Sequence, residues 1–514
     1  MTLYDISADF VVVGGGTAGS VLASRLSERR DVRVLLLEAG AADGPAMMAV
    51  PGAWPVLIGS EVDWGYATAP QPGLGGAVLP YPRGKVLGGS SSINAMAHLR
   101  GHRSAIDAWE LAGAKGWGHD DLLPFYRRSE HTEGLDPRYR GVGGPMKPAP
   151  TTQRHPAAVA CLQAFRELGY PVTADLNGAD QEGPAWYETN VVDGVRQSAA
   201  DAYLRPVLDR PNLTVLTGAQ VRHLLISPGR CTGVSYTLAG ELHTAQSTCE
   251  VVLCAGAIGS PQLLQLSGVG PADRLRSLDI EVAVDLPGVG ENFSDHPSGV
   301  AVYSAAQPMP AGTNNHADLL AALRSGPALN APDLHVLFAD IPLTPPGMQG
   351  PESGFTIYFA LLQPHSRGSV RLVSNDPTVA PSIDPGFLTD ERDVAGMLNG
   401  LRIAREIGGS QALAAWREAE VLPGPQVTTV AKMRQFLNRA IGTYFHGVGT
   451  CRIGIAADAV VDTQLRVHGI EGLRIADASV MPSIPGANTN ATVLAIAERA
   501  AATITTENSA GQLN

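Results

Sequence analysis

The chain has 514 residues and a formal net charge of −12, with 44% hydrophobic and 17% charged residues. This length exceeds what one hydrophobic core usually organises, so we expect two domains or one large composite unit. The composition is typical of a globular protein rather than a disordered chain, and the negative charge argues against nucleic acid or an anionic membrane surface as a partner.

The cysteines and the N-terminal residues indicate where the protein works. The five cysteines are scattered without the paired spacing of a zinc site or a redox motif, so we expect reduced thiols and no bound metal. The opening sequence MTLYDISADF lacks the basic and apolar regions of a secretory signal, and no run reaches the ~20 apolar residues of a membrane-spanning helix. We therefore expect a cytoplasmic protein without a transmembrane segment, as a monomer or a dimer.

Residues 9–40 predict a dinucleotide-binding βαβ unit. The β-branched run at residues 10–13 indicates a buried strand, and a glycine-rich turn and a helix with small residues follow it. A second strand then ends at Glu38. Strand, turn, helix and terminal acid have the spacing of a Rossmann unit, which alone leaves both FAD and NAD open as the ligand.

The turn contains the pattern GxGxxG, formed by Gly14, Gly16 and Gly19. Gly14 makes the tight turn, Gly16 lets a pyrophosphate approach the helix N-terminus, and Gly19 lets the helix pack close to the strand. Glu38 accepts hydrogen bonds from both ribose hydroxyls, and its negative charge disfavours the 2′-phosphate of NADP.

Two further stretches are rich in glycine. Residues 83–96, RGKVLGGSSSINAM, offer bare N–H groups and hydroxyls to an extended polar ligand, although a solvated loop has the same composition. Residues 249–255 indicate a strand, and we expect a short helix to start at Ser260 with Pro261 in its first turn.

Together these stretches resemble the glucose–methanol–choline (GMC) oxidoreductase family of FAD enzymes. The resemblance covers nearly the whole chain and rests on several separated motifs in the family's order. They are the Gly14 fingerprint, Asp63–Trp64, the GGSSSIN loop, GAIGSPQLLQLSGVG at 256–270, SRGSVRL at 366–372 with the DP that follows it, HGVGTCRIG at 446–454, and the segment from ADAS to the C-terminal helix.

The resemblance implies a mixed α/β and α+β fold. A discontinuous, Rossmann-like FAD-binding domain would comprise residues 1–150, 200–295 and 450–514. A substrate-binding domain would comprise residues 151–199 and 296–449, built on an antiparallel sheet with helices on one face.

The resemblance also implies the FAD contacts. Those to the ADP half and the adenine are Gly14, Gly16, Thr17, Gly19, Glu38 and Val221; those to the flavin, ribityl chain and pyrophosphate are Gly89, Asn94, Ala95, Met96, Asp477, Ala478 and Thr489.

Family members carry a catalytic histidine in the pattern H-x-x-G-T, which His446 matches, and a histidine or asparagine about ten residues before a C-terminal Glu. Asn488 stands ten residues before Glu498, with Asn490 as the second choice. A neutral imidazole takes the hydroxyl proton of an alcohol at physiological pH, and an amide N–H holds the same oxygen. The alternatives are a packed core histidine for His446 and a turn or helix cap for Asn488.

The expected reaction is the oxidation of a primary alcohol to an aldehyde, with O2 or a quinone or other electron carrier as acceptor. The sequence leaves aryl, furanic, aliphatic, polyol and choline-like alcohols open, and some relatives are hydroxynitrile lyases that use the histidine without redox chemistry. The candidate residues for the substrate pocket are Trp64, Tyr358, Ala360, Tyr444 and Phe445. The alternative is that these side chains only pack in the hydrophobic core.

Some relatives attach FAD covalently through a histidine just before the loop asparagine, where this chain has Ile93. An isoleucine side chain forms no such bond, so we predict non-covalent FAD. Acid precipitation should release the yellow flavin into the supernatant, and a yellow protein pellet would refute this prediction.

Overall fold

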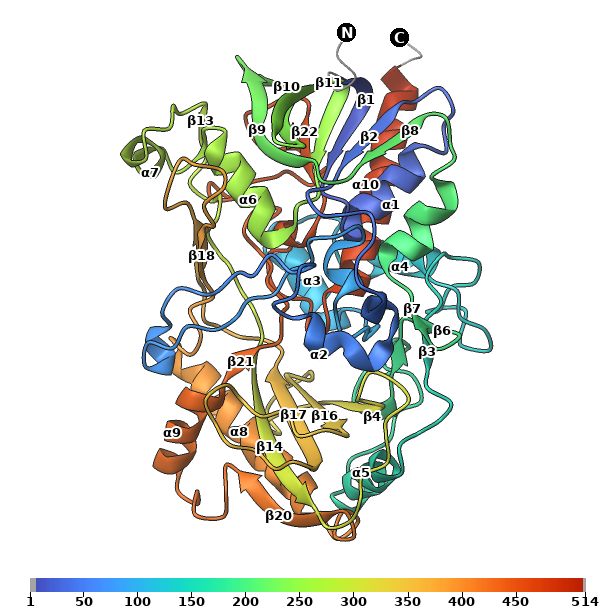
Figure 1. Ribbon diagram of the computed structural model, residues 1–514, viewed down its shortest axis with the longest axis vertical. Helices are drawn as coiled ribbons and strands as arrows, with labels where there is room; N and C mark the ends of the chain where they lie inside the picture. Colours follow the sequence, from blue (N-terminus) through green and yellow to red (C-terminus); the bar gives the residue numbers. More distant parts are fainter. Residues whose placement is uncertain (1–5, 512–514) are drawn as a thin grey trace.

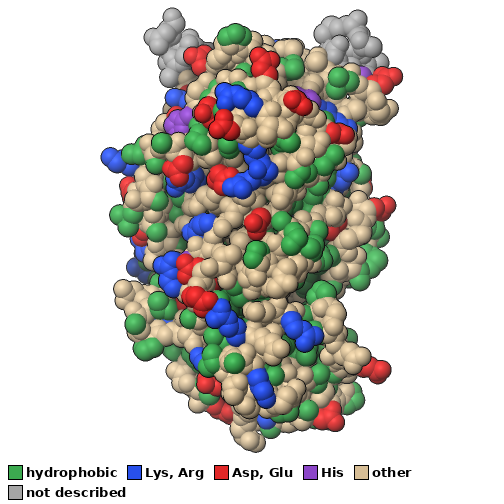
Figure 2. Space-filling view, turned by 90° about the vertical axis from the view of Figure 1, so that its left-hand side faces the viewer, with side chains coloured by type: hydrophobic (Ala, Val, Ile, Leu, Met, Phe, Trp, Pro, Cys, Tyr) green, Lys and Arg blue, Asp and Glu red, His purple; other side chains and the backbone are tan. Residues whose placement is uncertain are grey.

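The computed structural model describes residues 6–511 and contains two large sheets, one towards each end of its long axis (Figure 1). The first sheet lies at the end that carries both chain termini. Within the described residues, no helix combines the length and apolar character needed to cross a membrane. On the face that Figure 2 shows, acidic and basic side chains are interspersed rather than gathered into a basic patch.

The first sheet is mostly parallel, and its order follows the Rossmann pattern predicted from residues 9–40. Its central strands are buried on both faces, as a parallel sheet covered by helices requires. The order is β8 (Leu213–Leu216), β2 (Val34–Leu37), β1 (Ile6–Val13), β11 (Glu241–Leu253), β10 (Arg230–Leu238) and β9 (Gln220–Ser227), and β22 (Leu473–Ile475) also pairs with β11. The strands β9 and β10 run antiparallel to their neighbours.

Two helices far apart in sequence lie together beside this sheet (Figure 1). They are α1 (Thr17–Leu26) and α10 (Asn490–Gly511), and the buried Glu498 of α10 pairs with Arg25 of α1 at 2.7 Å. The C-terminal segment therefore returns to the nucleotide-binding unit that the N-terminus begins.

One predicted helix start is wrong. The helix α6 spans Gly256–Leu266, so Pro261 lies inside it rather than in its first turn. A proline in this position has no N–H to donate to the carbonyl of Ala257, four residues earlier. The hydroxyl of Thr450 donates to that carbonyl instead, at 2.7 Å, which allows the helix to begin directly after β11.

The second sheet is antiparallel. Its order is β20 (Arg417–Leu422), β14 (Pro297–Ala305), β17 (Gly354–Leu361), β16 (Leu334–Ala339), β15 (Leu319–Leu323) and β4 (Gly183–Trp186), and β21 (Gly442–Thr443) pairs with β14. Side chains alternate along each strand. In β17, Ile357 and Phe359 belong to a core cluster with residues of α5 (Pro156–Glu167), α8 (Glu391–Gly409) and α9 (Val430–Ala440), and β17 packs against α8. Tyr358 lies on the opposite face.

Shorter elements complete the structure. The short helices are α2 (Trp54–Leu57), α3 (Arg103–Leu111), α4 (His119–Ser129) and α7 (Ala272–Ser277). The short strand pairs are β3 (Ala149–Pro150) with β5 (Glu188–Thr189), β6 (Val191–Val192) with β7 (Val195–Arg196), β12 (Val269–Gly270) with β13 (Val284–Asp285), and β18 (Ser369–Arg371) with β19 (Ser382–Asp384). Single-turn 3₁₀ segments include Ala46–Ala49, Pro51–Ala53, Pro72–Leu74, Gly89–Ser92, Arg205–Val207 and Ala478–Val480, and Ala200–Leu204 forms a π-helical turn. The predicted fold class is confirmed, and the boundaries of the two predicted domains stay predictions.

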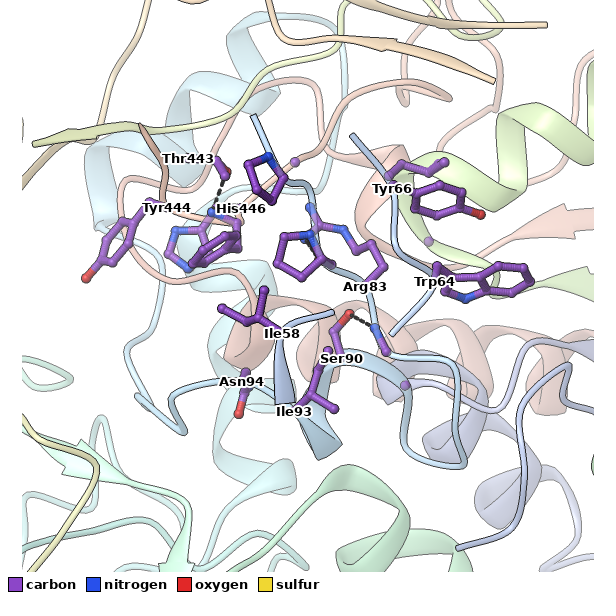
Figure 3. Close-up of a pocket in the computed structure, with 18 of the residues that line it drawn as sticks. Ile58, Trp64, Tyr66, Arg83, Ser90, Ile93, Asn94, Thr443, Tyr444 and His446 are labelled. Atoms are coloured by element: carbon purple, nitrogen blue, oxygen red, sulfur yellow. Dashed lines mark hydrogen bonds between the residues drawn. The ribbon is translucent and has the colours of Figure 1, made fainter. Parts of the chain in front are cut away.

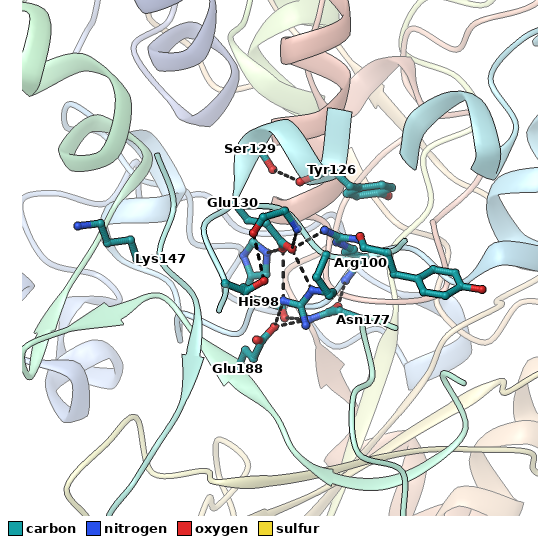
Figure 4. A network of polar contacts seen from close by, with 12 residues as sticks. His98, Arg100, Tyr126, Ser129, Glu130, Lys147, Asn177 and Glu188 are labelled. Carbon is teal, nitrogen blue, oxygen red and sulfur yellow. Dashed lines mark hydrogen bonds and ion pairs between the residues drawn. The ribbon is translucent and has the colours of Figure 1, made fainter. Parts of the chain in front are cut away.

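A buried ionic network ties the connecting segments together (Figure 4). Glu130, which follows α4 and is fully buried, lies 2.6 Å from Arg100 and 2.9 Å from Arg140. Arg140 also pairs with Asp175 at 2.8 Å and Glu188 at 2.5 Å. Burial opposes ionisation of Glu130, but the hydrogen bond with His98 and the charges of Arg100 and Arg140 hold the pKa of its carboxyl well below the usual range.

This network lies next to a segment that reaches the functional cavity described below. The carbonyl of Glu188 accepts from the His98 N–H at 2.9 Å, and Asn190 donates to the Met96 carbonyl at 2.8 Å. These two backbone hydrogen bonds hold residues 96–98 beside β5, whose Glu188 belongs to the ionic network.

Candidate active site

A cavity of about 1220 Å³ lies between the two sheets. Its walls come from the turn after β1, the loop at residues 83–96, the inner face of the second sheet, and the C-terminal stretches around His446 and Asn488. Figure 3 shows part of it, with residues of the 83–96 loop and of the stretch around His446 labelled. Pockets for small ligands usually measure about 300–1,000 Å³, so this one has room for a large cofactor and a substrate together.

The glycines at the nucleotide end allow close backbone approaches. Gly14 has φ +100°, and a Cβ there would lie 2.7 Å from the Cys254 carbonyl oxygen. A Cβ on Gly19 would lie 1.8 Å from the Gly14 carbonyl oxygen, so only glycine lets α1 rest on the turn. No side chain caps the start of α1, so its first N–H groups are available to an anion in the cavity.

Glu38 is held in place by two backbone donors. Its carboxylate oxygens accept from the N–H groups of Gly15 and Gly40, each at 2.7 Å. Burial raises the pKa of Glu38, while these two N–H groups act in the opposite direction. Each carboxylate oxygen keeps a second lone pair for a ligand hydroxyl.

Polar atoms without a protein partner also face this cavity. Thr17 donates to Asn490 Oδ1 at 2.8 Å, which leaves the buried Nδ2 of Asn490 without a partner. Asn488 Oδ1 is likewise buried and unpaired. Buried polar atoms are normally satisfied, so these atoms fit a ligand that carries hydrogen-bonding groups along its length, as FAD does.

Most of the predicted site residues line this one cavity. They are Gly14, Gly16, Thr17, Glu38, Gly89, Asn94, Ala95, Met96, Val221, Asp477, Ala478 and Thr489 among the cofactor contacts, with His446, Asn488, Trp64, Tyr358, Tyr444 and Phe445. Gly19 does not line it, because it packs α1 onto the turn. Ala360 does not line it either, since it is fully buried in register with Ser298 and His335.

The loop that carries His446 is fixed by a buried carboxylate. Asp295 accepts from the His446 N–H at 2.8 Å and from the Tyr81 hydroxyl at 2.7 Å, and the hydroxyl of Thr443 donates to it as well. Phe445 has φ +66°, an uncommon value for a bulky residue. Such a conformation persists where its surroundings determine it, and here the contacts of Asp295 on both sides do so.

The imidazole of His446 has a partner on each side. Its Nε2 lies 3.2 Å from Asn488 Nδ2, and its Nδ1 lies 3.0 Å from Nδ1 of His296. Tyr444 packs beside it at 4.5 Å between ring centroids. Burial lowers the pKa of His446 well below 6.5, and the neighbouring His296 and His335 act in the same direction. The ring is therefore neutral at physiological pH and has the protonation state of a general base.

The geometry separates the two asparagines proposed as its partner. Asn488 contacts the imidazole, whereas Asn490 begins α10 and bonds to Thr17. Asn488 therefore shares its side of the cavity with His446, as the first-choice assignment requires.

The wall opposite the nucleotide end is apolar and aromatic. Tyr358 and Tyr444 belong to this wall and lie 5.4 Å apart. Trp64 lies away from them, across Arg83 from His446 (Figure 3), where it stacks on Tyr66 at 5.7 Å and has Lys85 Nζ 4.7 Å from its ring centroid. Inward-facing residues of the second sheet complete this wall: Val300, Leu320, Leu337 and Ala339.

Asp295 and His296, which contact the loop and the imidazole, were not predicted from the sequence. In the sequence they are an isolated acid–histidine pair before an apolar strand, in SDHPSG. That pair of polar residues at the start of a buried strand was the only available signal. Among residues 6–511, no cluster of three His, Cys, Asp or Glu side chains is arranged to hold a metal ion.

Comparisons with known proteins agree with this arrangement. Two protein-family models, both described as GMC oxidoreductase, match residues 8–298 and 364–497. The chain belongs to the GMC oxidoreductase family. This GMC oxidoreductase is therefore a flavoprotein that acts on CH–OH groups, and its cofactor is FAD.

Individual relatives cover almost the whole chain. A mitochondrial choline dehydrogenase of Mus musculus is 39% identical over 526 aligned residues, which cover 96% of this chain and 88% of the relative. The crystal structure of pyridoxine 4-oxidase from Mesorbium loti is 37% identical with a TM-score of 0.93, covering 96% of this chain and 98% of that one. A formate oxidase of Aspergillus oryzae RIB40, whose structure concerns FAD modification, is 27% identical with a TM-score of 0.90, covering 98% and 99%.

The buried histidines predict a loss of stability in acid. Burial lowers the pKa values of His296 and His335 to about 3, and that of His446 is lowered too. Below pH about 6.5 the unfolded chain binds protons that the folded one excludes. Above that pH these histidines do not lower the free energy of unfolding. As the pH falls from there towards the folded-state pKa, each of them lowers the free energy of unfolding by up to about 1.4 kcal/mol per pH unit.

His335→Gln removes one of these groups, so its free energy of unfolding should fall less steeply than that of the wild type between pH 6.5 and pH 5. Denaturant titrations of the FAD-loaded proteins at several pH values measure both slopes. Parallel slopes would contradict the account. His131→Gln, in a half-exposed loop position, is the matched control and should leave the slope unchanged.

Proposed function

We propose that this GMC oxidoreductase oxidises apolar or aromatic primary alcohols to aldehydes, with His446 as general base and Asn488 orienting the alcohol oxygen. The observation that supports the proposal is the contact of 3.2 Å between His446 Nε2 and Asn488 Nδ2 on the cavity wall. Bound FAD supplies the hydride acceptor.

His446 and Asn488 have different roles at the alcohol oxygen. When the alcohol binds, its hydroxyl replaces the N–H of Asn488 as the donor to Nε2 of His446, and the N–H of Asn488 turns to the alcohol oxygen. Nε2 then accepts the hydroxyl proton, and the N–H of Asn488 stabilises the charge that develops on the oxygen. Holding the oxygen between two fixed groups also orients the carbon that loses the hydride. Because burial lowers the pKa of His446, the base needs no prior deprotonation at neutral pH.

The charges that line the cavity favour an uncharged alcohol. Among residues 6–511, the acidic side chains on its wall are Glu38 and Asp477, and both accept hydrogen bonds from neighbouring backbone N–H groups. Arg83, Lys85 and Arg439 also line it. A quaternary ammonium would meet these cations without a free carboxylate to offset them, whereas an aromatic alcohol would contact the apolar wall.

The proposal also includes the electron acceptor, the cellular location and the oligomeric state. Similarity to a choline dehydrogenase and to an oxidase supports O2 or a quinone or other carrier as the electron acceptor. We propose the cytoplasm as the location, supported by five scattered cysteines without paired spacing, and a monomer or dimer as the working form.

An anaerobic panel of alcohols tests the proposal through bleaching of the oxidised flavin. Benzyl-type alcohols should bleach it, with a second-order rate constant at least about tenfold above that of choline, since about 1.4 kcal/mol of repulsion suffices for this factor. Choline as the better substrate would contradict the proposed substrate class, and cyanohydrin cleavage without bleaching would favour the lyase reaction instead.

His446→Ala should keep its bound FAD and slow this reduction by on the order of 10²- to 10⁴-fold, the usual contribution of a general base. His131→Ala, which changes a histidine of a surface loop, should reduce its flavin at the wild-type rate. Equal rates in His446→Ala and the wild type would refute the assignment of the base.

A further inference from the structure

His296 has both ring nitrogens committed. Its Nε2 lies 3.0 Å from the carbonyl oxygen of Leu362, and its Nδ1 lies 3.0 Å from His446 Nδ1. The side chain is fully buried, and the two imidazoles meet edge to face with centroids 5.2 Å apart. The contact between the rings is thus a directed hydrogen bond in a dry environment.

The direction of each hydrogen bond follows from the chemistry of its partners. A backbone carbonyl only accepts, so Nε2 of His296 carries the hydrogen. A buried, neutral imidazole has one N–H, so Nδ1 of His296 is the acceptor and Nδ1 of His446 is the donor. Neutral His446 then has its lone pair on Nε2, the atom that faces Asn488.

The other side of His446 independently indicates the same tautomer. Asn488 turns its Nδ2 towards His446 Nε2, and an amide nitrogen only donates. In this orientation the Nδ2 of Asn488 has an acceptor in His446 only if Nε2 carries the lone pair, while Asn488 Oδ1 stays unpaired within the described part of the chain. The hydrogen bonds on the two sides of His446 therefore indicate the same tautomer.

We propose that His296 is a positioning residue that fixes the tautomer of His446, so that the basic nitrogen always faces the substrate. The inference rests on the proposed role of His446 as the base. A neutral imidazole free to exchange tautomers would spend part of its time with Nε2–H towards the alcohol, unable to take a proton. The Leu362 carbonyl, which directly follows the last residue of β17, anchors the arrangement next to the second sheet.

Two amide substitutions separate the two hydrogen bonds of His296. The amide of His296→Asn places an oxygen near the former Nδ1, and it keeps the acceptor for His446 but not the donor for Leu362. The longer His296→Gln places its amide near the former Nε2, and it keeps the donor for Leu362 but not the acceptor for His446. Both new side chains are polar and buried. If His296 only supported the structure, the two substitutions would therefore reduce the rate of flavin reduction equally.

We expect His296→Asn to reduce flavin with benzyl-type alcohol within about tenfold of the wild type, and His296→Gln to be slower by on the order of 10²- to 10⁴-fold, the scale on which a wrong tautomer costs catalysis. In His296→Gln the loss should fall on the rate of reduction and not on substrate affinity. Equal losses in the two variants would overturn the proposal.

A readout independent of activity uses ¹⁵N-labelled histidine in the FAD-loaded protein, with the signals of His446 assigned by their loss in His446→Ala. The wild type and His296→Asn should show a protonated Nδ1 and an unprotonated Nε2, and His296→Gln a shift towards protonated Nε2. Protonated Nε2 in the wild type would overturn the proposal. If the spectra fit but no alcohol is oxidised, the proposed function fails and the tautomer assignment stands.

Discussion

The burial of an imidazole between two hydrogen-bonding partners is the constraint on which this active site depends. The ring of His446 contacts His296 on one side and Asn488 on the other, and the backbone N–H of His446 donates to Asp295. In water the ring would exchange protons and orientations freely. In the dry interior each exchange would leave a buried polar atom unpaired, at a cost of about 1–3 kcal/mol. The same burial that lowers the pKa of His446, the proposed base, therefore also fixes the orientation of its ring.

The two-sheet architecture supplies this environment. The first sheet ends at a glycine turn and at the uncapped start of α1, which suits an anionic nucleotide. The second sheet presents an apolar face and contributes the strand that begins after His296, and the Leu362 carbonyl directly follows its strand β17. The cavity lies between the two sheets, and in the proposed function the cofactor and the alcohol meet there.

The sequence predicted the parts of the site that obey local rules. Gly14, Gly19 and Glu38 followed from the spacing of a βαβ unit, because strand, turn and helix impose fixed distances along the chain. The start of α6 was mispredicted because the hydroxyl that replaces the missing proline hydrogen bond belongs to Thr450, far away in sequence. Asp295 and His296 were missed for the same reason: their partners are about 150 residues away, and only the folded chain brings them together.

A crystal structure of the FAD-loaded enzyme with a benzyl-type alcohol or an unreactive analogue tests the central claim most directly. The account predicts that the hydroxyl oxygen lies within about 3.2 Å of both His446 Nε2 and Asn488 Nδ2, with the aromatic ring against the apolar face of the second sheet. An alcohol oxygen bound away from both side chains, with His446 Nε2 hydrogen-bonded only to protein, would contradict it.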